Sequence, residues 1–177
     1  LAGGNGGNVL MGNNAGGTMT AGQNNVFIGN GAGSNGNLLG AYNIGIGRIA
    51  LEDLSGGSNY NTALGEWAGG NATSIVGGTF IGARSGLNVS TGDNNTFLGG
   101  WTGGTYTTGE GNIIIGANAD SPTSTATADY ELNIGNAIYG TLDDDATSAI
   151  GDASASIIID GNLAMTGTGA VTLTAGT

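Results

Sequence analysis

The chain has 177 residues, including 39 Gly and one Pro, and it carries 13 acidic side chains, two Arg, no Lys and no His. The net charge of -11 excludes a duplex-binding protein, which needs cations against the phosphates, and an anionic membrane surface would repel the chain. No run of 18 apolar residues is present to span a membrane, and the absence of Cys excludes disulfides and thiolate metal sites.

One sequence word recurs along residues 1–119 with a step of 17 or 18 residues. Each copy contains an Asn, three mostly apolar or β-branched residues, a Gly, two variable residues and a small residue. The central glycines are Gly12, Gly29, Gly47, Gly65, Gly82, Gly99 and Gly116. So short a period is typical of repeat architectures, and we expect about seven stacked rungs of an all-β parallel β-solenoid. The regular placement of apolar residues argues against disorder.

The three residues before each central glycine predict a short strand. The first and third of them are β-branched and large aliphatic residues, as in Val26 and Ile28, and they share one face. The middle residue, as in Phe27 or Phe80, points to the opposite face and is also mostly apolar. One face can pack inside the coil. The other predicts association of identical chains about a three-fold axis, although a wider solenoid that buries both faces within one chain remains an alternative.

A column of Asn stands four residues before the central glycines. Its members are Asn8, Asn25, Asn43, Asn61, Asn95 and Asn112, with Gly78 at the one interruption. Rungs stacked about 4.8 Å apart would let each side-chain carbonyl accept a hydrogen bond from the next amide. Asn also tolerates the left-handed backbone of a tight corner. We interpret the column as a structural ladder rather than a set of metal or sugar ligands.

After each central glycine, a small residue and then usually a second Gly mark another corner, at which Leu51 and Asp120 depart from the pattern. Seven rungs give a rod of about 35 Å. Residues 120–130, with the only proline, predict a linker loop. Residues 131–152 contain an altered rung and an acidic turn. Residues 153–177, with a strand-like run at 157–159, predict the start of a β-rich fibre shaft, and we expect the chain to be a segment of a longer protein.

Aromatic and basic residues meet in the variable column two residues after the central glycine. There Arg84 stands between Trp67 and Trp101 on successive rungs, which predicts an outward sandwich of one guanidinium between two indoles. Two interpretations are open: a platform for a sugar ring, or a surface ladder that shields the backbone.

Acidic residues give few candidates for chemistry. Asp143, Asp144 and Asp145 are weak candidates for Ca²⁺ ligands, because no known calcium-loop spacing is present, and a solvated acidic turn explains them. The four glutamates occupy dissimilar places in the rung, which disfavours a carboxylate pair for glycoside cleavage; they are Glu52, Glu66, Glu110 and Glu131. We expect no catalytic residues and no cofactor.

The words NTALGEWAGG (61–70) and NNTFLGGWTGG (94–104) resemble the glycine-rich repeats of bacteriophage tail fibres, and the segments YELNIGNAIYG and GNLAMTGTGAVTL resemble tail-fibre shaft sequence. The repeats are also similar to the β-roll heads of trimeric autotransporter adhesins, whose period is shorter. The resemblance implies an elongated homotrimer in the virion that attaches to a glycan or protein receptor on the host cell. It leaves open a bacterial surface adhesin or extracellular filament and, less favoured, a polysaccharide-degrading tailspike.

Overall fold

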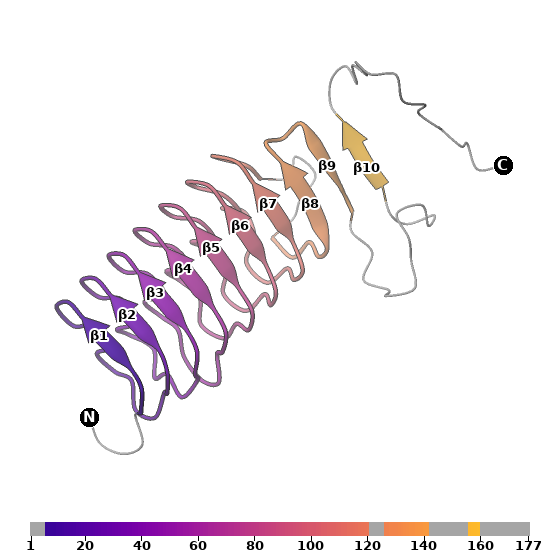
Figure 1. Ribbon diagram of the computed structural model, residues 1–177. Helices are drawn as coiled ribbons and strands as arrows, with labels where there is room; N and C mark the ends of the chain where they lie inside the picture. Colours follow the sequence, from indigo (N-terminus) through magenta and orange to yellow (C-terminus); the bar gives the residue numbers. More distant parts are fainter. Residues whose placement is uncertain (1–5, 121–125, 142–155, 160–177) are drawn as a thin grey trace, which may run out of the picture.

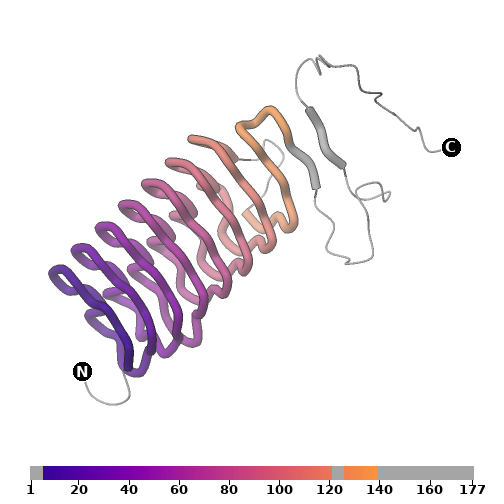
Figure 2. The backbone as a smooth tube through the Cα atoms, in the orientation of Figure 1, coloured from indigo at the N-terminus to yellow at the C-terminus, as the bar shows by residue number. Residues whose placement is uncertain are grey.

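The computed structural model describes residues 6–120, 126–141 and 156–159, and within these ranges it consists of strands and turns without a helix (Figure 1). The chain winds into stacked turns that each add one short strand to a common sheet (Figure 2). Eight strands pair in parallel and in chain order, which confirms the predicted parallel β-solenoid: β1 (Val9–Met11), β2 (Val26–Ile28), β3 (Ile44–Ile46), β4 (Thr62–Leu64), β5 (Thr79–Ile81), β6 (Thr96–Leu98), β7 (Ile113–Ile115) and β8 (Glu131–Ile134).

The strand register places equivalent positions of the repeat above one another. Phe80 pairs with Phe97, for example, and Thr79 with Thr96. Hydrogen bonds join the rungs on other sides too, because bridges connect Leu38 with Gly56 and Asn59 with Val76. Stacking in register therefore holds the whole circumference of each rung.

The central glycine is required at the corner that ends each strand. At Gly82 the backbone φ is +129°, a value that L side chains rarely adopt. A Cβ atom there would lie 2.5 Å from the carbonyl oxygen of Gly99 in the next rung. Both the dihedral angle and the close approach of two backbones exclude a side chain, which explains the period of the sequence.

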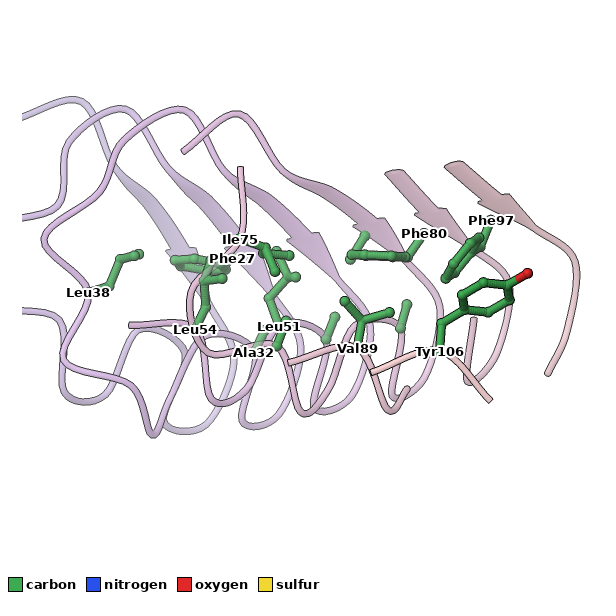
Figure 3. Packing of buried hydrophobic residues seen from close by; sticks show 14 of the residues in the cluster. Phe27, Ala32, Leu38, Leu51, Leu54, Ile75, Phe80, Val89, Phe97 and Tyr106 are labelled. Atoms are coloured by element: carbon green, nitrogen blue, oxygen red, sulfur yellow. The ribbon is translucent and has the colours of Figure 1, made fainter. Parts of the chain in front are cut away.

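The middle residue of each strand points into the coil and forms a single narrow core. Phe80 and Phe97 are fully buried with ring centroids 5.7 Å apart, and Phe97 lies 5.3 Å from the ring of Tyr106, which comes from the opposite side of the coil (Figure 3). Leu54 and Val89 take the place of Tyr106 in other rungs. The predicted inward face is thus confirmed, and one layer of side chains fills the rung.

The first and third residues of the strands form an outward face that the chain leaves exposed or half-buried. Met11 is 62% exposed, Leu64 is 47% exposed and Leu98 is 43% exposed. The alternative of a wider solenoid that buries both faces is therefore wrong for this chain, because a rung of 17 or 18 residues encloses only the inward side chains.

The parallel sheet ends in a hairpin. In β8, Asn133 takes the inward place that Ile114 holds in β7, and Gly135 and Asn136 then adopt positive φ angles of 61° and 59°. These angles fit a type I′ turn, and Ala137 N–H donates to the Ile134 carbonyl at 3.1 Å. Strand β9 (Ile138–Thr141) returns antiparallel to β8, and β10 (Ser156–Ile159) pairs antiparallel with β9.

The domain boundaries shift slightly from those expected. Within the expected linker 120–130, Ala126 accepts a hydrogen bond from Thr107 N–H at 2.8 Å, and Tyr130 N–H donates to the Glu110 carbonyl at 2.8 Å. Residues 126–130 are therefore one side of a further rung rather than a linker. The strand-like run at 157–159 lies in β10, whereas the acidic turn at 142–152 and the rest of the expected shaft lie outside the described residues.

Candidate functional site

The corner after each strand carries the outward column that contains the two tryptophans. The backbone is left-handed there, with φ of 60° at Trp67 and 59° at both Arg84 and Trp101. Asn14, Ile49 and Asn118 adopt the same conformation at the same position of other rungs. At this position Trp101 is 51% exposed.

The expected sandwich of Arg84 between two tryptophans is only half formed. The Arg84 guanidinium carbon lies 4.2 Å from the centroid of the Trp101 ring, whereas the ring of Trp67 is approached by Arg48 at 5.7 Å. Each arginine thus contacts the tryptophan of the following rung. The described part of the chain has two arginine–tryptophan pairs in place of one three-layer stack.

The two arginines differ in their charge partners. Arg48 forms an ion pair with Glu66 on the next rung, and both side chains are about half exposed. This is the one ion pair among the described residues, and Arg84 takes no part in it. The positive charge at Trp101 is therefore available to a group outside the chain, whereas the charge at Trp67 is compensated.

A pocket of about 310 Å³ opens beside Trp101 and extends over three successive rungs. Trp101 and Arg84 lie on it together with polar side chains and one half-buried apolar side chain. Its other lining residues are Leu87, Asn88, Gly104, Thr105, Asn118 and Asp120. The amide of Asn88 donates to the Gly104 carbonyl at 2.6 Å, which ties two of the rungs together at the pocket.

Asp120 contributes a carboxylate to this pocket. Partial burial raises the pKa of Asp120 above its ordinary value, and hydrogen bonds from Thr105 and Gly104 oppose the rise. One of these is the bond from Thr105 N–H to Oδ1, at 3.4 Å. Sequence reasoning did not place Asp120 at a site, although its departure from the second glycine column was the available signal.

The asparagine column forms a hydrogen-bonded ladder inside the corner before the strand. Asn25, Asn43, Asn61, Asn95 and Asn112 are fully buried. The Asn43 side-chain amide donates to Asn25 Oδ1 at 3.0 Å, and Asn61 repeats the contact with Asn43 at 2.9 Å. The backbone N–H of each upper residue donates to the same oxygen. The column thus has the contacts expected of a structural ladder.

The left-handed residue of this corner is not the asparagine itself but the residue before it. Asn24, Tyr42, Tyr60 and Asn94 have positive φ, whereas the ladder residues do not. The backbone of a ladder asparagine pairs with the preceding rung instead: Asn43 N–H donates to Asn25 Oδ1, and the Asn43 backbone carbonyl accepts from Val26 N–H. The parallel rings of Tyr42 and Tyr60 stack at this corner with their centroids 5.3 Å apart. Both rings are exposed, and the sequence analysis missed this contact.

The glutamates do not meet in one place. Glu66 pairs with Arg48, Glu110 accepts a hydrogen bond from the Tyr130 hydroxyl, and Glu131 accepts one from the Tyr106 hydroxyl. Burial, followed by the charge of Asp53, raises the pKa of Glu52.

Asp143, Asp144 and Asp145 lie outside the described residues. Among those described, no group of three acidic side chains is placed to hold a metal ion, and no helix could cross a membrane.

Comparison of the chain with family models, with curated proteins and with solved structures finds no match.

Proposed function

We propose that this chain is a rod segment of a homotrimeric attachment fibre, of the kind found in phage tails, which carries a receptor-binding surface away from the virion. The observation that carries the proposal is the outward face of the sheet, where apolar side chains repeat on every rung from β1 to β8. A row of exposed apolar side chains that repeats along the rungs is typical of an interaction site.

Self-association accounts for a face that repeats with the rung. Removing one of these half-exposed Leu or Ile side chains from water stabilises an assembly by about 1 kcal/mol. Identical chains offer identical rung spacing, so their outward faces match along the whole rod, and closed rotational symmetry lets every copy bury the same face. The three-fold order follows from the resemblance to tail-fibre repeats and to adhesin heads.

The rod is suited to a mechanical and adhesive role. Each rung contacts mainly its neighbours, so length is gained by adding rungs without redesign of a core. The partner is a glycan or protein receptor on the host cell. A bacterial surface adhesin would use the same rod, and the close likeness of NTALGEWAGG and NNTFLGGWTGG to phage-type repeats favours the virion.

The proposal predicts a solution mass about three times the 17.1 kDa of one chain, measured by light scattering on a sizing column. Leu98→Glu places a charge on the outward face and is expected to release monomers, because a buried unpaired carboxylate is costly. Thr91→Glu is the control, since it adds the same charge at an exposed residue outside the strands. A monomeric mass for the unaltered chain, or equal masses for the two variants, would contradict the proposal.

A further inference from the structure

We infer that the pocket beside Trp101 is a carbohydrate site that takes one uncharged sugar ring, such as a neutral hexose at the end of a cell-surface glycan. The inference deepens the proposed attachment function, on which its biological role rests, by naming the chemistry of the ligand and the residues that meet it. The binding residues are Trp101, Arg84 and Asp120.

Trp101 supplies an apolar platform. Its indole is half exposed, and the contact with Arg84 at 4.2 Å holds the ring in place before a ligand arrives. The C–H face of a pyranose is apolar, and an aromatic ring presents a large rigid surface at low cost in side-chain entropy.

Polar groups surround this platform on three rungs. Arg84 presents a planar fork of N–H donors, and Asp120 presents acceptor oxygens on the same pocket. Asn88 and Asn118 add amides at its border. Adjacent hydroxyls of a sugar act both as donors and as acceptors, so a pocket with both kinds of group suits them. A lining of this kind around an apolar surface is typical of small-ligand sites.

The charges favour an uncharged ligand. The pocket contains one cation and one carboxylate, so its own charges cancel. The chain as a whole carries -11, which repels polyanions such as acidic polysaccharides. An acidic sugar would gain a contact with Arg84 but would also face Asp120. A neutral ring avoids that repulsion and still uses both groups.

The size of the pocket fits a single small ligand. Its volume of about 310 Å³ lies at the lower end of the range for ligand pockets, which suits one sugar ring. Few contacts of this size give a dissociation constant of about 1 mM per site. Three copies in a fibre would act together on a dense glycan surface, where weak sites become effective through multivalency.

Two matched variants test the site. Asn already occupies the corner of Trp101 in other rungs, at Asn14 with φ of 56° and Asn118 with φ of 52°, so Trp101→Asn keeps the fold. Trp67→Asn makes the same change where arginine is already paired with Glu66. Saturation-transfer NMR with the methyl glycosides of glucose, galactose and mannose, and with glucuronate as the charged probe, measures binding to the full chain.

The unaltered chain is expected to bind at least one neutral glycoside, and Trp101→Asn to weaken it by about tenfold or more, with Trp67→Asn within about twofold. Trp67→Phe leaves Trp101 as the only tryptophan, so its emission should shift with the sugar. No saturation at about 50 mM of any neutral probe, equal loss in both Asn variants, or a preference for glucuronate would overturn the inference. The solution mass is measured in parallel, so failure of the trimer is seen separately from failure of the site.

Discussion

Asn43 shows how a single residue joins three rungs. Its backbone N–H and its side-chain amide donate to Asn25 in the rung below, and its side-chain Oδ1 accepts from Asn61 in the rung above. The side-chain amide also donates to the Ser58 backbone carbonyl at 2.8 Å. All of these groups are buried, so water cannot replace a lost partner. The ladder therefore fixes the register of the stack.

We expect Asn43→Ala to lower the free energy of unfolding by about 3 kcal/mol or more. The substitution removes the hydrogen-bond acceptor of the buried Asn61 N–H groups and the donor to the Ser58 carbonyl. Urea unfolding followed by circular dichroism measures the loss. The control is Asn71→Ala, whose exposed amide makes one long bond of 3.5 Å to Asn88 and should change stability by under about 0.5 kcal/mol. Equal effects would show that burial of the ladder contributes nothing.

The ladder is interrupted at Gly78, where the conformation leaves little room for a side chain. A Cβ atom there would lie 2.8 Å from the buried ring of Phe80 and 3.2 Å from Asn61 Oδ1, so an asparagine would have to displace the ring. Asn61 Oδ1 accepts from Gly78 N–H instead, at 2.8 Å. Asn25 and Asn95 precede the buried rings of Phe27 and Phe97, so a large inward side chain does not by itself exclude the ladder residue.

At the residue scale, the sequence predicts repeated contacts better than single ones. The ladder is visible because six asparagines recur in one column, and their hydrogen bonds follow from rung spacing alone. The contact of the Arg84 guanidinium with the ring of Trp101 rather than Trp67 depends on side-chain torsions that a repeat does not encode. Asp120 becomes part of a pocket only because it lies beside residues of two lower rungs.

The rung as an element depends on glycine at the corner after the strand. We expect Gly82→Ala to lower the free energy of unfolding by about 3 kcal/mol or more, because its Cβ would meet the immovable backbone of Gly99 at 2.5 Å and its φ is strained. Thermal unfolding measures the change. Gly57→Ala serves as the comparison, since nothing lies within 4 Å of its Cβ, and it should be neutral. Tolerance of Gly82→Ala would refute the close approach of rungs.

The strands were predictable because they are the repeated part of the rung. Three residues before each central glycine form every strand from β1 to β7, with the middle residue inward. Residues 126–130 were harder to assign, because their rung departs in composition from the repeat, and only its hydrogen bonds to residues such as Thr107 reveal it. The exposure of the outward face was left open, since the width of the coil decides it.

At the scale of the whole molecule, the stack behaves as a one-dimensional array. Deletion of residues 66–82 removes one repeat of 17 residues and should leave a shorter rod, because Gly65 is then followed by Ala83 in the same word. Asn61 would lie below Asn95, which restores the ladder across the interruption. We expect one cooperative thermal transition and an unchanged β-sheet circular dichroism spectrum per residue.

A deletion that is not a whole rung provides the contrast. Removing residues 66–74 leaves a rung too short to close and shifts every later column relative to the earlier ones. Loss of the β-sheet signal in this variant, with retention in the other, is the expected result. If both deletions unfold the chain, the rungs are not independent units.

The hairpin after β8 closes the parallel sheet with antiparallel strand pairs. Stacked fibrils of the amyloid type grow without limit because every layer offers the next the same strand edge. Here β9 and β10 run antiparallel to their neighbours, so a further parallel strand would meet a different pattern of donors and acceptors. Addition of parallel rungs beyond the hairpin is thereby discouraged, so the sequence, rather than protein concentration, sets where the parallel stack ends.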